Sequence, residues 1–345
     1  MDSTVALILV QDGLVMGSIY ALLAIALVLV FTITRVILIP QGAFVAFASL
    51  SFNLLERGVR PGTASLLVGL GAAAFFIDIL RNLRRTSRRW IMLHVLSDLA
   101  FPVALYFLVT WLAPLKLGVA VDIVLTCCVI APLGPYIYRV AFQPLASASV
   151  LVLLIAALGV HLALTVLGLI FFGPEGFVAE AFSRASFSFG PIIVPGQNIV
   201  ILTVVFVLMG ASWIMFERTV VGKALRAVAV NRVGALIVGI PISATGEIAF
   251  GLAGLIGAIS GVLIAPVTMI YYDSGFLIGL MGFVAAIVGG MGSYPLAVAG
   301  ALGVGVLQAF AAFWNSGYTQ VIVFMSLIPA LLLRSLRAPV VEEDE

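Results

Sequence analysis

The chain has 345 residues, of which 63% are hydrophobic and 9% are charged, and its mean hydropathy is +1.28. This composition excludes a soluble globular protein and predicts a polytopic helical membrane protein, because apolar runs of about 20 residues recur along the chain. The formal net charge of +2 gives no reason to expect a nucleic-acid partner.

Eleven continuous apolar runs are candidate membrane spans, so the predicted fold class is all-α. They cover residues 5–33, 36–55, 63–80, 90–113, 117–138, 147–172, 196–216, 242–265, 276–291, 296–314 and 318–333. The ninth run is short enough to be re-entrant or broken instead. With the N-terminus outside, 13 of the 17 Lys and Arg residues lie inside and four lie outside. The positive-inside rule therefore predicts an N-out, C-in topology.

The first two runs carry small and helix-breaking residues. Gly13, Gly17 and Ala21 are spaced four apart, which is typical of a face for close helix contact. Pro40 and Gly42 would break the second run, and broken helices at membrane depth often line substrate paths.

The middle of the chain has few side chains that could bind a metal, form a disulfide or line a pore. Cys127 and Cys128 are adjacent within an apolar run and suggest neither a metal site nor a disulfide. His161 lies mid-span, where both a packing role and a pore role are open. Residues 175–195 are polar and alternating, which predicts a small external strand pair.

The segment from Glu217 to Pro241 holds four cations and one anion between two apolar runs. A charge at the bilayer centre costs roughly 2.5–3.5 kcal/mol, so we expect this segment outside the membrane, on the cytoplasmic side. Asn231 can cap the second of two short helices, and Gly239 can end it. An ordinary basic loop is the alternative interpretation.

Glycines recur in the last third of the chain. Gly251, Gly254, Gly257 and Gly261 form a predicted close-packing stripe on one helix. Glycines near position 290 imply non-helical backbone or very close helix approach, and we expect them to face the Gln41–Gly42 break. The predicted translocation-path residues are Gln41, Gly42, Gly289, Gly290, Gly292 and Ser293.

Several segments together resemble the permease subunits of LIV-type (branched-chain amino-acid) ABC transporters. In chain order, the matching segments are 13–22, 41–42, 138–145, 155–160, 171–174, 222–227 and 289–293. Leu38 and Ala43 stand where the family usually has Asn and Glu, which leaves the substrate open. Residues 72–115 match nothing in the family, which predicts a two-span insertion.

The resemblance implies the LIV-type ABC importer permease fold, with broken or re-entrant helices. Residues 1–341 would form a single transmembrane permease domain, followed by an acidic tail at residues 342–345. Residues 217–241 would be the cytoplasmic coupling loop that docks onto the ATPase. The coupling residues implied are Gly222, Lys223, Ala224, Arg226, Ala227, Asn231, Ala235 and Gly239.

The implied function is the translocation path of an ATP-binding-cassette importer for a small polar solute, such as a branched-chain or related amino acid. The implied partners are cytoplasmic ATPase subunits, a second homologous permease subunit, a periplasmic or other extracytoplasmic solute-binding protein, and the lipid bilayer. The implied location is the bacterial inner (cytoplasmic) membrane.

The sequence predicts no enzyme activity, no cofactor and no metal, because no Walker motif or catalytic set lies outside the apolar runs. The alternative function is an ATPase-independent secondary transporter or channel. Such a transporter would need intramembrane carboxylates for its coupling ion, and Asp78, Asp98 and Asp122 are candidates near span ends.

Overall fold

The computed structural model describes residues 3–82, 88–189, 192–291 and 293–335, which are predominantly helical. This confirms the predicted all-α fold class of a polytopic membrane protein. The expected acidic tail at residues 342–345 and the path residue Gly292 lie outside the described residues.

The elements follow the apolar runs closely. The helices are α1 (Ser3–Thr34), α2 (Gln41–Glu56), α3 (Thr63–Asn82), α4 (Arg88–His94), α5 (Phe101–Leu112), α6 (Val119–Ile130), α7 (Leu133–Ile137), α8 (Val150–Phe172), α9 (Gly196–Arg218), α10 (Val220–Val230), α11 (Arg232–Ile237), α12 (Ile242–Ile264), α13 (Ser274–Gly289), α14 (Tyr294–Trp314), α15 (Thr319–Met325) and α16 (Leu327–Ser335). Two π-helical turns, η1 (Val95–Ala100) and η3 (Tyr138–Phe142), and three 3-10 turns, η2 (Ala113–Leu115), η4 (Gln143–Leu145) and η5 (Ser316–Tyr318), complete the helical part. The expected strand pair is present as β1 (Ser186–Phe189) antiparallel to β2 (Ile192–Pro195).

Each of the eleven predicted runs corresponds to a helical segment, but not every segment is long enough to span. Within the described residues, eight helical stretches have the length and apolar composition needed to cross a membrane. The helix at 274–289 is shorter, as expected for the ninth run, and so is the apolar stretch at 316–332. In the second run, helix α2 begins only at Gln41, and the irregular backbone before it is buried at Val36 and Leu38.

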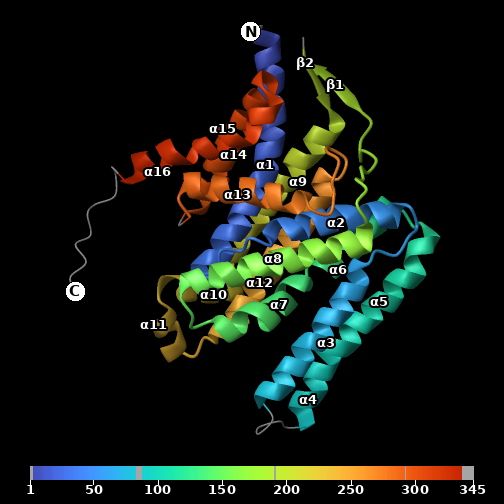
Figure 1. Cartoon of the computed structure of the whole chain (residues 1–345), viewed down its shortest axis with the longest axis vertical. Coiled ribbons are helices and arrows are strands. Elements are labelled where there is room, and N and C mark those ends of the chain that lie inside the picture. Colours follow the sequence, from blue (N-terminus) through green and yellow to red (C-terminus); the bar gives the residue numbers. More distant parts are fainter. Residues whose placement is uncertain (1–2, 83–87, 190–191, 292, 336–345) are drawn as a thin grey trace.

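Helix α1 lies at the centre of the bundle, with α2, α12, α13 and α14 around it (Figure 1). In the apolar stretch of α1, 83% of the residues are buried inside the protein. The corresponding shares are only 22% in α8 and 17% in α9. The hairpin formed by α3, α4 and α5 projects away from this bundle (Figure 1). The fold is therefore a bundle around α1 with an attached hairpin.

The small residues predicted on α1 meet a matching row on α14. A Cβ at Gly13 would lie 2.6 Å from the Cα of Val306, and a Cβ at Gly17 would lie 2.9 Å from the carbonyl oxygen of Ala301. In the other direction, a Cβ at Gly305 would lie 2.3 Å from the carbonyl oxygen of Gly13. The predicted close-contact face is confirmed, and it brings the two backbones together.

The glycine stripe on α12 is also confirmed, and it contacts two different neighbours. A Cβ at Gly254 would lie 2.7 Å from the Ala131 carbonyl oxygen, between α6 and α7. A Cβ at Gly261 would lie 2.2 Å from the Val45 carbonyl oxygen, on α2. Helix α12 therefore joins α2 to the α6–α7 segment.

Replacing Gly305 with leucine should lower the thermal stability of the detergent-purified protein, because the new side chain would force α1 and α14 apart. Overpacking of this kind costs about 1–3 kcal/mol. Gly303→Leu is the matched control, because it lies on the same helix with nothing within 4 Å of its Cβ position. Tryptophan fluorescence during heating measures the thermal stability of both variants. An equal loss of stability in Gly305→Leu and Gly303→Leu would contradict the packing argument.

Candidate functional site

The segment expected to couple to an ATPase forms two short capped helices, as predicted. The hydroxyl of Thr219 accepts from the Gly222 N–H (3.0 Å) and starts α10, and Asn231 Oδ1 accepts from the Gly234 N–H (2.8 Å) and starts α11. At the end of α11, Gly239 has φ +86°, and the N–H of Ile240 bonds to the Ala235 carbonyl (2.9 Å). This is the left-handed glycine cap that satisfies the last carbonyls of a helix.

The eight predicted coupling residues divide between the inside and the surface of this segment. Gly222 and Ala235 are buried, and a Cβ at Gly222 would lie 2.2 Å from the Met215 carbonyl oxygen. Ala224, Arg226 and Ala227 are half-buried, with Arg226 paired to Glu217 at 2.5 Å, whereas Lys223, Asn231 and Gly239 are exposed. The buried members hold the two helices against the bundle, and the exposed ones are open to a partner.

Sequence reasoning missed a group of exposed apolar side chains at the end of α10, on α11 and at the residue that follows α11. Val230 and Ile237 are 87% and 80% exposed, and Val233, Leu236 and Val238 are also exposed. Neither α10 nor α11 belongs to a candidate span, so these side chains lie outside the apolar helices of the bundle. Apolar groups gathered on an exposed surface mark a contact with another protein or with the membrane surface.

Gln41 and Gly42 begin α2 at a buried position. The Gln41 side chain is fully buried, and its Nε2 donates to the Ala253 carbonyl on α12 (3.0 Å). Its Oε1 is also buried and accepts no hydrogen bond from any described residue. A buried acceptor without a donor is costly, which is typical of a functional position.

Gly289 and Gly290 do not face this break, so that expectation is wrong for these two glycines. A Cβ at Gly42 would lie 1.7 Å from the carbonyl oxygen of Gly275, at the start of α13. Gly289, at the other end of α13, instead packs on Ala297 of α14, at 2.3 Å from its Cβ position. Gly290 ends α13 in the left-handed conformation with φ +91°, and Ser293 is half-buried before α14.

A small apolar cavity lies beside the break. Its volume is about 170 Å³, and its lining comes from α1, the irregular segment before α2, α8 and α13, including Leu38, Leu158 and Phe276. The ring of His161 on α8 packs on Phe276 with centroids 5.0 Å apart, and the buried Nδ1 has no hydrogen-bond partner among the described residues. This cavity offers space for an aliphatic group beside the irregular segment that precedes α2.

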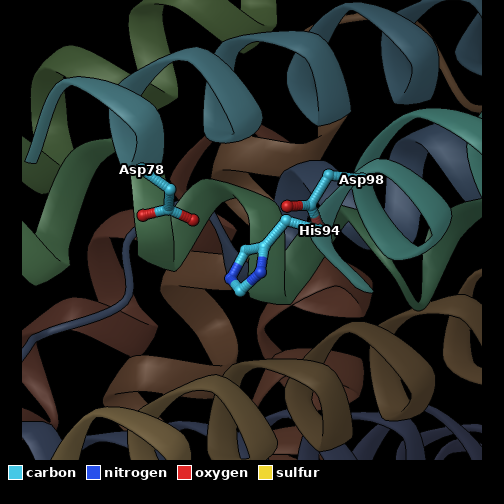
Figure 2. A group of neighbouring side chains, drawn as sticks. All are labelled: Asp78, His94 and Asp98. Atoms are coloured by element: carbon cyan, nitrogen blue, oxygen red, sulfur yellow. The ribbon is translucent and has the colours of Figure 1, made fainter. Parts of the chain in front are cut away.

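A buried ion-pair cluster joins the projecting hairpin to the bundle. Figure 2 shows Asp78 on α3 converging with His94 and Asp98 from the neighbouring helical stretch. Arg139 donates to both carboxylate oxygens of Asp98 (2.7 and 2.8 Å) and also to Asp78. Asp98 and Arg139 lie on the π-helical turns η1 and η3, a distortion that frequently marks functional positions.

The cluster has the donor set of a metal site, since ligand atoms of Asp78, His94 and Asp98 lie within 4.8 Å of one another. The guanidinium of Arg139 already supplies the positive charge and engages both oxygens of Asp98. We therefore interpret the cluster as a structural ion pair. Asp78 and Asp98, two of the three candidate coupling-ion carboxylates of the alternative secondary transporter, thus pair with Arg139.

Comparison with known proteins decides the family. The sequence model described as "Branched-chain amino acid transport system / permease component" matches residues 9–332. The chain belongs to this family. It is a multi-pass membrane permease, as the resemblance of its motifs implies.

Curated relatives of the permease agree with this assignment. The high-affinity branched-chain amino acid transport system permease protein BraD of Pseudomonas aeruginosa is 30% identical over 208 residues, covering 58% of this chain and 68% of BraD. The LivH proteins of Escherichia coli K12 and Salmonella typhimurium carry the same description. Each is 31% identical to this chain over 208 residues, covering 58% of this chain and 67% of LivH. No solved structure matches the permease significantly.

Replacing Arg139 with methionine should destabilise the permease strongly, because two buried carboxylates would lose their counter-charge. Removing one partner of a buried ion pair costs about 3–5 kcal/mol. The control is Arg184→Met, which breaks the exposed pair with Glu180, and an exposed pair contributes only about 0–1 kcal/mol. Thermal unfolding measures both variants, and adding Asp78→Asn and Asp98→Asn to Arg139→Met should restore part of the loss.

Proposed function

We propose that this chain is the membrane-spanning permease subunit of an ATP-binding-cassette importer for branched-chain or related amino acids. The observation that carries the proposal is the exposed surface of α10 and α11, which combines apolar side chains with Lys223 outside the apolar spans. An ATPase subunit docked on this surface would drive the transport cycle.

The position of α10 supports such a coupling role. The helix packs on α9 and also contacts α1 and α12, the helices around which the bundle is arranged. Its buried face is formed by Leu225 and Val228, and its N-cap ties it to the end of α9. A push on the exposed side of α10 would therefore act directly on the centre of the bundle.

The substrate class rests on the relatives and on the cavity beside the α2 break. BraD and LivH are described as branched-chain amino acid permease proteins. The apolar cavity of about 170 Å³ suits an aliphatic side chain, and the Gln41 amide oxygen beside the break has no described donor. We propose that Gln41, Gly42, Gly289, Gly290, Gly292 and Ser293 belong to the translocation path.

The proposed setting is the bacterial inner membrane, with the N-terminus outside and the α10–α11 surface in the cytoplasm. The chain would pair with a second permease subunit and receive its substrate from a solute-binding protein. Residues 1–341 would form one permease domain, within which residues 72–115 are a two-span insertion attached through Arg139.

Placing a charge on the coupling surface should abolish ATPase docking. Val233 is exposed in the first turn of α11, where an aspartate is compatible with the helix dipole, so Val233→Asp should leave the fold intact. The tagged variant should recover less than a tenth of the ATPase subunits that the wild type recovers in a pull-down from membranes, and uptake should fall in parallel.

The matched control is Val59→Asp, which places the same charge on an exposed valine between α2 and α3. It should recover the ATPase subunits as well as the wild type does. Full recovery with Val233→Asp would mean that α10 and α11 are only a basic loop that fixes the membrane topology.

A further inference from the structure

A second, polar cavity lies where three connecting segments of the chain meet. Its volume is about 610 Å³, and it is lined by the end of α2, the turn into α6 and the segment before β1. Small-molecule sites typically have volumes of about 300–1,000 Å³. None of the residues assigned above to coupling or to the path lines it.

The inner wall of this polar cavity is acidic and carries one buried hydrogen-bond acceptor without a donor among the described residues. Asn53 is 3% exposed, and its buried Oδ1 accepts no hydrogen bond from any described residue. Asp122 is 5% exposed, and neither it nor the half-buried Glu56 forms an ion pair within the described parts of the chain. Glu56 accepts a hydrogen bond from the backbone of Glu180 and is attracted by Arg57, but the negative charges of Asp122 and Glu180 repel it. A positively charged hydrogen-bond donor would stabilise the acidic and acceptor groups of this wall.

The rim of the cavity carries the opposite charge. Arg57 and Lys116 are exposed and line the same space, as does the exposed carboxylate of Glu180, which is itself paired with Arg184 (2.9 Å). The guanidinium of Arg57 lies 4.7 Å from the centre of the Phe177 ring, a cation–π contact. Lys116 has φ +46°, a left-handed conformation that is unfavourable for lysine, and such strain gathers at binding sites. The cavity is thus negative at its base, and cations outnumber the single carboxylate, Glu180, at its mouth.

We propose that this cavity binds a free α-amino acid as a zwitterion. The ammonium group would lie toward Asn53, Glu56 and Asp122, and the carboxylate toward Arg57 and Lys116. An inorganic cation would satisfy only the inner wall, and a simple carboxylate only the rim. The assignment rests on the proposed function, and in the proposed topology it places the site on the outer side, where the permease would receive its substrate.

Binding of radiolabelled L-leucine to the purified full chain in lipid nanodiscs tests the proposal. We expect saturable binding by the wild type and at least tenfold weaker binding by Asp122→Asn, because the amide removes the charge that faces the ammonium group. Glu175→Gln is the matched control, because Glu175 is an exposed carboxylate of the segment that follows α8 and does not line the cavity. Absence of saturable wild-type binding, or an unchanged dissociation constant in Asp122→Asn, overturns the proposal.

Two analogues of leucine separate the two halves of the site. 3-Methylbutylamine lacks the carboxylate and 4-methylpentanoate lacks the amine, and each should compete at least tenfold less well than unlabelled leucine. Competition by the amine as strong as that by leucine would make this a cation site and overturn the zwitterion assignment.

A protection experiment covers the case in which Asp122→Asn fails to fold. Ala181 is exposed and lines the cavity, so Ala181→Cys, in a chain with both native cysteines replaced by serine, should react with a membrane-impermeant maleimide. Leucine should slow that reaction at least fivefold, and equal rates with and without leucine overturn the proposal.

Uptake by the reconstituted wild-type assembly separates this proposal from the proposed function. ATP-dependent leucine uptake without protection of Ala181→Cys would overturn the cavity assignment alone. The proposed function itself fails if the assembly takes up none of the branched-chain amino acids or their close relatives.

Discussion

Direct contact between helix backbones is the constraint on which this permease depends. Lipid tails are as apolar as leucine, so burial of apolar side chains gives helices in a bilayer little reason to associate. Glycine removes the side chain and lets dispersion forces act between backbones at short range. Helix α1 uses this device against α14, α12 uses it against α2 and the α6–α7 segment, and α2 uses it against α13. The central bundle is therefore held by close packing of complementary helix surfaces, and the positions of its glycines determine which helices can meet.

The projecting hairpin is attached by a different kind of contact. Gly71 brings α3 against the backbone of Asp98, and Arg139 then binds the carboxylates of Asp78 and Asp98. A guanidinium that serves two carboxylates is held on more than one side, so the hairpin has a defined orientation. The π-helical turns at Asp98 and Arg139 re-aim these side chains relative to a regular helix. Charge complementarity thus orients the hairpin, whereas close packing at glycines orients the helices of the bundle.

How much could be predicted from the sequence depends on the range of the interactions. The Asn231 cap of α11 and the end of that helix at Gly239 are set within one helical turn, and both were predictable. The close-contact faces around Gly13 and Gly254 follow from spacing on a single helix. Arg139 contacts Asp98 and Asp78, which are 41 and 61 positions away in the sequence, and no local sequence pattern predicts a π-helical turn. The neighbour of Gly42 was mispredicted for the same reason, because the register between α2 and α13 is set by the whole bundle.

The crossing of α2 and α13 also limits how this permease can move. A Cβ at Gly42 would lie 1.7 Å from the Gly275 carbonyl oxygen, and one at Gly279 would lie 2.9 Å from the Gly42 nitrogen. Packed helices commonly adjust by sliding, but a one-residue slide here would drive Gln41 or Ala43 into the facing backbone. The two helices must therefore travel as one rigid body. Displacement is easier at α8 and α9, which are mostly unburied by the rest of the chain. Opening and closing would pivot around this crossing, with the outer helices as the moving wall.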